Sequence, residues 1–184
     1  LTIREHRGEL AGLTVAFLGD GASNMAQSYL LAGATAGMHV RIGAPAAYAP
    51  SASVVADAER RAVETGGSVA VLTSPTDAVA GADVVVTDTW VSMGKEDEKA
   101  ARVKTFGGYQ VDEALMATAK PDALFLHCLP ADRGYEVAAE VIDGPQSVIW
   151  DEAEYRLHAQ KALLVWLFEQ NEAAAAAPVR KAGF

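Results

Sequence analysis

The chain has 184 residues, 51% of them hydrophobic, and its 15 basic and 24 acidic residues give a formal net charge of −9. A chain of this length buries one α/β core, and its acidic balance argues against a nucleic acid or an anionic membrane as a partner. No apolar run is long enough to cross a membrane, and the single cysteine, Cys128, excludes an internal disulfide framework. We expect a cytoplasmic protein with one domain that acts on a small molecule.

Short apolar runs that alternate with segments of helical pattern predict a parallel sheet covered by helices on both faces. The fold class expected is therefore α/β, a three-layer, doubly wound, mainly parallel sheet of the Rossmann-like type. The predicted strands are 13–18, 39–42, 69–72, 84–87, 124–127 and 148–150. The predicted helices between them are 24–36, 53–65, 75–80, 96–105, 112–118 and 136–142.

The two ends of the chain differ from its middle. Residues 1–10 have the pattern of the end of an interdomain helix, and we place the domain at 11–172. A long helix is predicted from about Glu152 to Ala173, and it should pack on another surface because apolar residues nearly surround its axis. The tail 173–184 is expected to fray. A start without methionine fits the later part of a longer protein as well as a trimmed chain.

The segment GDGASN at 19–24 connects the first predicted strand to the next helix. A dinucleotide-binding turn has a third glycine where this chain has Asn24, and an acid about 20 residues further on. No Asp or Glu lies between Asp20 and Asp57, so the sequence argues against a nucleotide site. It favours a tight turn with a Ser or Asn cap, although an amide at this sheet edge can also hold a carboxylate.

A second polar group follows the predicted strand 84–87. Asp88 comes directly after this strand, and a loop with Ser92 and Met93 follows. Asp88 is either a cap or turn residue or a carboxylate for the ammonium group of a substrate, with Ser92 as its polar neighbour. The pattern alone leaves both interpretations open.

A third candidate is the segment HCLP at 127–130, which ends another predicted strand. Neighbouring strand residues point to opposite faces, so His127 and Cys128 are not expected to act as a nucleophile and its base. A lone cysteine on an apolar strand is more often core than chemistry. A cis Leu129–Pro130 bond would turn the carbonyls of Cys128 and Leu129 toward a ligand.

No pattern indicates a metal site or a cofactor. The four histidines show neither HExxH spacing nor a CxxC pair nearby, and the chain has no phosphate-binding loop and no nucleophile elbow. We predict neither a metal nor a cofactor.

Four segments together closely resemble the C-terminal, ornithine-binding domain of the ornithine carbamoyltransferase family. They occur in the family's order and spacing, and D-x-x-x-SMG combined with HCLP is highly specific. The segments are GDGASNMAQS at 19–28, DTWVSMG at 88–94, LHCLP at 126–130 and DEAEYRLHAQKALL at 151–164. The resemblance implies transfer of a carbamoyl group from carbamoyl phosphate to the δ-amine of L-ornithine, which gives L-citrulline and phosphate.

The resemblance also implies how the amino acid is held. Asn24 and the Met93 backbone would bind the ornithine carboxylate, and Asp88 and Ser92 would bind its α-ammonium group. These roles replace the cap and turn interpretations given above for Asn24 and Asp88.

By the same resemblance, Cys128 is the catalytic residue, a proton acceptor or close neighbour of the reacting amine, beside the Leu129 carbonyl. An amine with a pKa of about 10.4 must lose a proton before it attacks. Cys128, Leu129 and Arg156 would contact carbamoyl phosphate. Arg156 suits this ligand because a guanidinium group pairs well with its oxygens. Without the resemblance, Arg156 would be read as a surface salt-bridge residue.

The family builds most of its carbamoyl phosphate site from an N-terminal domain, whose Ser-x-Arg-Thr loop and His-Pro-x-Gln segment are absent from this chain. The isolated chain is therefore expected to be inactive, and the complete protein to be a homotrimer. Two alternatives stay open: a carbamoyltransferase for putrescine, N-acetylornithine or aspartate, and a non-catalytic amino-acid-binding module. Asp88 with Ser92 favours a substrate that has a free α-ammonium group, which argues against putrescine and N-acetylornithine.

Overall fold

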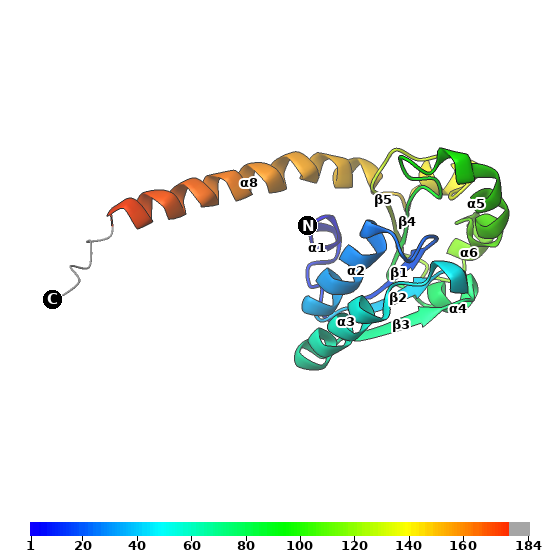
Figure 1. The fold of residues 1–184 in the computed structure, drawn as a ribbon, viewed down its shortest axis with the longest axis horizontal. Coiled ribbons are helices and arrows are strands. Elements are labelled where there is room, and N and C mark those ends of the chain that lie inside the picture. The colour runs from blue at the N-terminus through cyan, green and yellow to red at the C-terminus, as the bar shows by residue number, and fades with distance from the viewer. Residues whose placement is uncertain (177–184) are drawn as a thin grey trace.

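Five parallel strands form the centre of the fold in the computed structural model, which describes residues 1–176 (Figure 1). Their spatial order is β3-β2-β1-β4-β5, and every neighbouring pair is parallel. The strands are β1 (Thr14–Leu18), β2 (His39–Gly43), β3 (Ser68–Leu72), β4 (Val84–Thr87) and β5 (Leu124–His127). The strands β2 and β3 lie on one side of β1, and the strands β4 and β5 lie on its other side. The carboxyl ends of β1 and β4 therefore form a topological switch point.

Helices cover both faces of the sheet, and the alternation of strand residues explains how. Val15 and Phe17 point into a core with α2 and α3, whereas Ala16 and Leu18 point into a second core with α4, α6 and α7. These layers confirm the predicted fold class. The helices are α1 (Thr2–Arg7), α2 (Asn24–Thr35), α3 (Ala52–Thr65), α4 (Pro75–Val79), α5 (Lys99–Phe106), α6 (Glu113–Met116), α7 (Ala139–Ile142) and α8 (Ile149–Ala176).

The predicted strand 148–150 is wrong. The chain is extended only briefly, where Val148 N donates to Phe125 O at 3.0 Å, and α8 begins at Ile149. Ile149 is buried as the first residue of this helix, and two acidic residues follow in its first turn, where the helix dipole favours negative charge. An apolar run this short does not distinguish a strand from a buried helix start.

Three predicted helices are also shorter than expected. The segment 96–105 divides into a 3₁₀ turn at Glu96–Glu98 and α5. The segment 112–118 is helical only at Glu113–Met116, and the segment 136–142 only at Ala139–Ile142. Glu136 and Val137 are instead buried in the preceding loop, where Val111 N donates to Glu136 O and Val137 bridges to Val111. Tertiary contacts of the loop therefore take these residues out of the helix.

The long helix α8 extends away from the sheet (Figure 1). Its apolar side chains are exposed over the outer part, with Trp166 at 54% and Phe168 at 67%. The surface on which this helix was expected to pack is therefore not present within residues 1–176. None of the described helices is both long enough and apolar enough to cross a membrane. The helix continues to Ala176, and the remainder of the tail predicted to fray, 177–184, lies outside the described residues.

Candidate functional site

The carboxyl ends of β1, β4 and β5 lie side by side, and each carries one of the predicted site residues. Asn24 begins α2 after β1, Asp88 follows β4, and Cys128 follows β5. A hydrogen bond from Thr87 Oγ1 to Leu18 O, 2.9 Å long and buried, joins the ends of the first two strands. The sheet thus brings residues from three distant segments to one edge, which is where open α/β sheets bind ligands.

The turn between β1 and α2 holds Asn24 at the start of its helix. Gly19 has a backbone φ of 118°, which residues with a side chain rarely adopt. Gly21 has no room for a side chain, because a Cβ there would lie 2.8 Å from Tyr48 O. Ser23 is the cap residue, since its Oγ accepts a hydrogen bond from Ala26 N at 3.1 Å. The Asn24 side chain is exposed, and the structure gives it no hydrogen bond to the described residues, so its amide can accept a ligand.

Asp88 and Cys128 are in direct contact. Cys128 Sγ donates to Asp88 Oδ1 at 3.2 Å, and the same oxygen accepts a hydrogen bond from Thr89 N at 2.8 Å. Burial, followed by the charge of Asp88 and by this hydrogen bond, raises the pKa of Cys128 to about 12. The thiol is therefore protonated at neutral pH and acts as a donor to the carboxylate.

His127 points away from Cys128, as the strand alternation predicts. Leu129 N donates to His127 Nδ1 at 2.9 Å, so the ring proton is on Nε2, which lies 3.3 Å from Glu136 Oε1. Glu136 Oε1 also accepts from Asp132 N at 2.6 Å, and both members of the pair are buried. The Leu129–Pro130 bond is cis, and Leu129 has a φ of 55°. No local pattern in the sequence marks Glu136 as the partner of His127.

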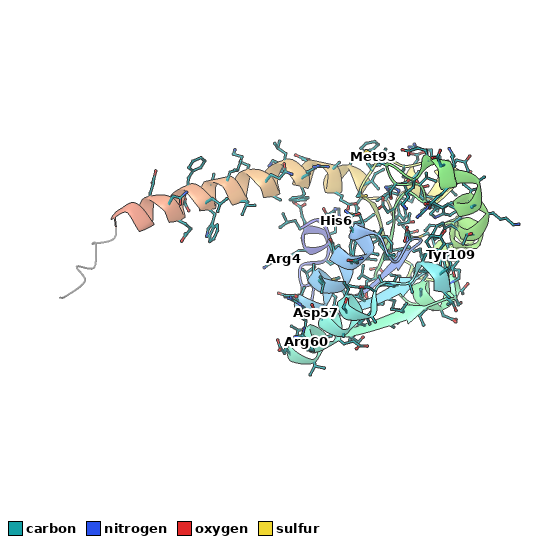
Figure 2. All side chains as sticks on the ribbon, viewed as in Figure 1. Arg4, His6, Asp57, Arg60, Met93 and Tyr109 are labelled. Carbon is teal, nitrogen blue, oxygen red and sulfur yellow. The ribbon has the colours of Figure 1, made fainter. Side chains whose placement is uncertain are left out.

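The loop after Asp88 presents its predicted binding residues differently. The Met93 side chain is 98% exposed and lies at the upper rim of the body in Figure 2. Ser92 is half-buried, and its carbonyl accepts a hydrogen bond from Lys95 N at 3.0 Å. The structure brings Asp88 and Cys128 into contact, whereas neither Ser92 nor Met93 forms a hydrogen bond with them. A role for Met93 would have to come from its backbone.

Arg156 lies on a neighbouring groove of about 360 Å³ between α1, α2 and the first turns of α8. Its side chain is exposed, and Tyr29, Leu126 and Glu152 line the same groove. Glu152 accepts a hydrogen bond from His127 N at 2.9 Å, and its burial raises the pKa of this carboxyl group. Burial, with Glu152 nearby, also raises the pKa of Tyr29. Neither Glu152 nor Tyr29 was singled out from the sequence, because their proximity is tertiary.

A doubly wound sheet with polar side chains gathered at its switch point defines a class: an α/β domain that takes a small polar ligand at the carboxyl ends of its strands. The model of the family "Aspartate/ornithine carbamoyltransferase, Asp/Orn binding domain" matches residues 11–167. The chain belongs to this family.

Individual relatives agree with this assignment. The chain is 74% identical over 171 residues to an ornithine carbamoyltransferase of Clavibacter sepedonicus, covering 93% of this chain and 56% of that protein. A relative of the same name from Renibacterium salmoninarum is 68% identical, with 93% and 55% covered. The structure of ornithine carbamoyltransferase from Pyrococcus furiosus superimposes with a TM-score of 0.85 at 49% identity, over 89% of this chain and 52% of that one. The chain spans about half the length of the curated relatives it matches.

Proposed function

We propose that this chain is the ornithine-binding half of an ornithine carbamoyltransferase, which converts carbamoyl phosphate and L-ornithine to L-citrulline and phosphate in arginine biosynthesis. The contact between Cys128 and Asp88 at the carboxyl ends of β5 and β4 carries the proposal. This contact supplies a carboxylate acceptor and a thiol donor at one edge of the sheet, and both suit the binding of an amino acid. The names of relatives that are 65–75% identical support the same reaction.

Two pairs of groups would hold the amino acid by its ends. Asp88, with Ser92, would bind the α-ammonium group, because a carboxylate makes short, charge-assisted hydrogen bonds to an ammonium. Asn24 and the Met93 backbone would bind the carboxylate. The exposed amide of Asn24 and the positive end of α2 both suit a negatively charged group.

The reaction joins the δ-nitrogen of ornithine to the carbonyl carbon of carbamoyl phosphate. The nitrogen supplies the electron pair for the new bond, the bond between that carbon and the phosphate oxygen breaks, and phosphate leaves with the electrons. The nitrogen must also lose two protons, one to solvent before it attacks and one to the departing phosphate as the amide forms. Since the Cys128 thiol has a pKa near 12 beside Asp88, we propose that Cys128 and the Leu129 carbonyl orient the amine by hydrogen bonding, and that Cys128 is not a free thiolate at neutral pH.

The carbamoyl phosphate site would need more than this chain. Only Cys128, Leu129 and Arg156 of this chain are proposed to contact carbamoyl phosphate, and Arg156 alone would contact its phosphoryl oxygens. Several pre-organised donors are needed to stabilise such a leaving group. We propose that an N-terminal domain supplies the rest, that the complete protein is a homotrimer in the cytoplasm, and that the isolated chain is inactive. Light scattering on the complete protein tests the trimer.

The test of the function is citrulline formation by the full-length protein that contains this chain, supplied with carbamoyl phosphate and, separately, ornithine, N-acetylornithine, putrescine and aspartate. Turnover with ornithine alone supports the proposal. A solved structure that is 32% identical bears the name N-acetyl-L-ornithine transcarbamylase, so turnover with N-acetylornithine would change the proposed substrate and keep the chemistry. Ornithine binding without turnover would indicate that the protein is a non-catalytic amino-acid-binding module.

A further inference from the structure

One buried cation takes no part in the site described above. Arg102, on α5, is 6% exposed, and its guanidinium donates to three oxygens. Nη1 lies 2.8 Å from Asp20 Oδ2 and 3.0 Å from the Trp90 carbonyl oxygen, while Nε lies 2.8 Å from Glu98 Oε2. The guanidinium carbon is also 5.1 Å from the centre of the Tyr48 ring. No motif in the sequence marks Arg102.

The partners of Arg102 belong to the two segments that carry the proposed ornithine contacts. Asp20 lies in the turn that leads to Asn24, and its other oxygen accepts a hydrogen bond from Ala22 N at 3.0 Å. Trp90 and Glu98 lie in the loop that starts at Asp88 and contains Ser92 and Met93. One guanidinium therefore connects the turn 19–24 to the loop 88–98.

Packing beside this ion pair supports the same connection. A Cβ at Gly19 would lie 3.5 Å from Trp90 Cδ1, so the indole lies against the turn. The Trp90 ring also stacks on Phe106 of α5, with 5.9 Å between centroids and 25° between planes. The loop is thus held on one side by the turn and on the other by α5, with Arg102 between them.

We propose that Arg102 is a positioning residue that clamps the loop 88–98 onto the turn 19–24, and so sets the spacing between the groups that bind the two ends of the amino acid. The inference rests on the proposed function. Arginine suits the task because its planar fork donates in fixed directions, whereas a lysine ammonium cannot reach Asp20, Trp90 O and Glu98 with the same geometry. The Asp20 side chain, 13% exposed, also needs a partner for its charge.

The first experiment measures the clamp without activity. Amide hydrogen exchange of the 184-residue chain should become faster in both segments, 19–24 and 88–98, in R102Q and less so in R102K. The matched control is R60Q, which removes an exposed arginine paired with Asp57 on α3, far from this edge in Figure 2. Exchange that is unchanged in both segments, or raised only in α5, overturns the clamp.

The second experiment uses the full-length enzyme and separates positioning from general stability. R102K and D20N should raise the KM for ornithine about 10-fold or more, with a smaller fall in kcat and an unchanged KM for carbamoyl phosphate. The double variant D20N/R102Q should be no worse than R102Q alone if the two side chains act as one unit. Equal rises in both KM values, or none, overturn the inference. If R102Q does not fold, the KM values of R102K and D20N alone test the inference.

Failure of the two proposals can be told apart. If the wild-type full-length protein forms no citrulline, the proposed function fails, and the ornithine part of this inference fails with it. If the wild type is active and R102K keeps the wild-type KM for ornithine, only the role of Arg102 is wrong.

Discussion

Replacing Asp88 by Asn should make the Cys128 thiol more acidic and faster to react with a disulfide reagent. In the native chain burial is the largest cause of the raised pKa, and the charge and hydrogen bond of Asp88 come next. Asn keeps the shape of the side chain and removes its charge, so the pKa should fall part of the way from about 12 toward 9.0. Burial remains in the variant and should keep the pKa above 9.0.

The size of the effect follows from these two pKa values. A rise from 9.0 to about 12 lowers the thiolate fraction near neutral pH about 1,000-fold, since each pKa step is tenfold. A more basic thiolate is a better nucleophile, with a Brønsted slope of about 0.4–0.5, which restores about 20-fold. Native Cys128 should therefore react about 50-fold more slowly than an ordinary thiol of equal access, and the D88N variant should recover part of that factor.

The assay is the release of thionitrobenzoate from a disulfide reagent, followed across about pH 7 to 11. The chain has one cysteine, so the signal reports Cys128 alone. The control is D122N, which removes an exposed carboxylate that pairs with Arg7. An inflection near the ordinary thiol pKa in the native chain would refute the effect of burial and Asp88 together. Identical profiles for the native chain and D88N would remove Asp88 as a cause.

Three further results are expected. In the full-length enzyme, Asp88→Asn should raise the ornithine requirement 10-fold or more, from about 1.5–3 kcal/mol for a charge-assisted contact; an unchanged ornithine dependence would exclude Asp88 from the site. Cys128→Ala should reduce citrulline formation while circular dichroism stays native, and wild-type turnover at every pH from about 6 to 9 would return Cys128 to the core. Glu136→Ala leaves His127 Nε2 and Asp132 N without their acceptor and should lower the free energy of unfolding by about 2 kcal/mol or more in urea denaturation. A loss below about 0.5 kcal/mol would show that water replaces the carboxylate.

The sequence predicted the strands well because each contains a short, mostly apolar run bounded by polar turns. These runs are largely buried in β1, β4 and β5, whereas the edge strand β3 has no fully buried residue. Those runs also predicted that Asp88 and Cys128 meet at one edge of the sheet, since both follow strands directly and parallel strands end at a common edge. The exception was 148–150, where the apolar run leads into a helix that begins at Ile149. A window this short carries no period, so the pattern could not separate the two states.

The polar groups that support the site could not be found in the same way. Glu136 was placed in a predicted helix, and its partner His127 comes from the end of a strand. Arg102 lies 82 residues from Asp20, with which it pairs. Such partners meet only through the tertiary fold, and no local period or spacing marks them. Arg102 also lies among other charged residues in a predicted helix, which is ordinary for a face exposed to solvent.

The strand order has a consequence for how the chain acquires its structure. The pairs β1–β2 and β2–β3 join neighbours in sequence, whereas β4 must return past two finished strands to reach the other side of β1. Until it does, one edge of the central strand has unpaired amides and carbonyls, which invites association with other chains. Non-local pairing of this kind slows folding. A nascent chain therefore completes the turn with Asn24 before Asp88 and Cys128 exist beside it, and the open flank of β1 is the segment on which a chaperone would be most useful during synthesis.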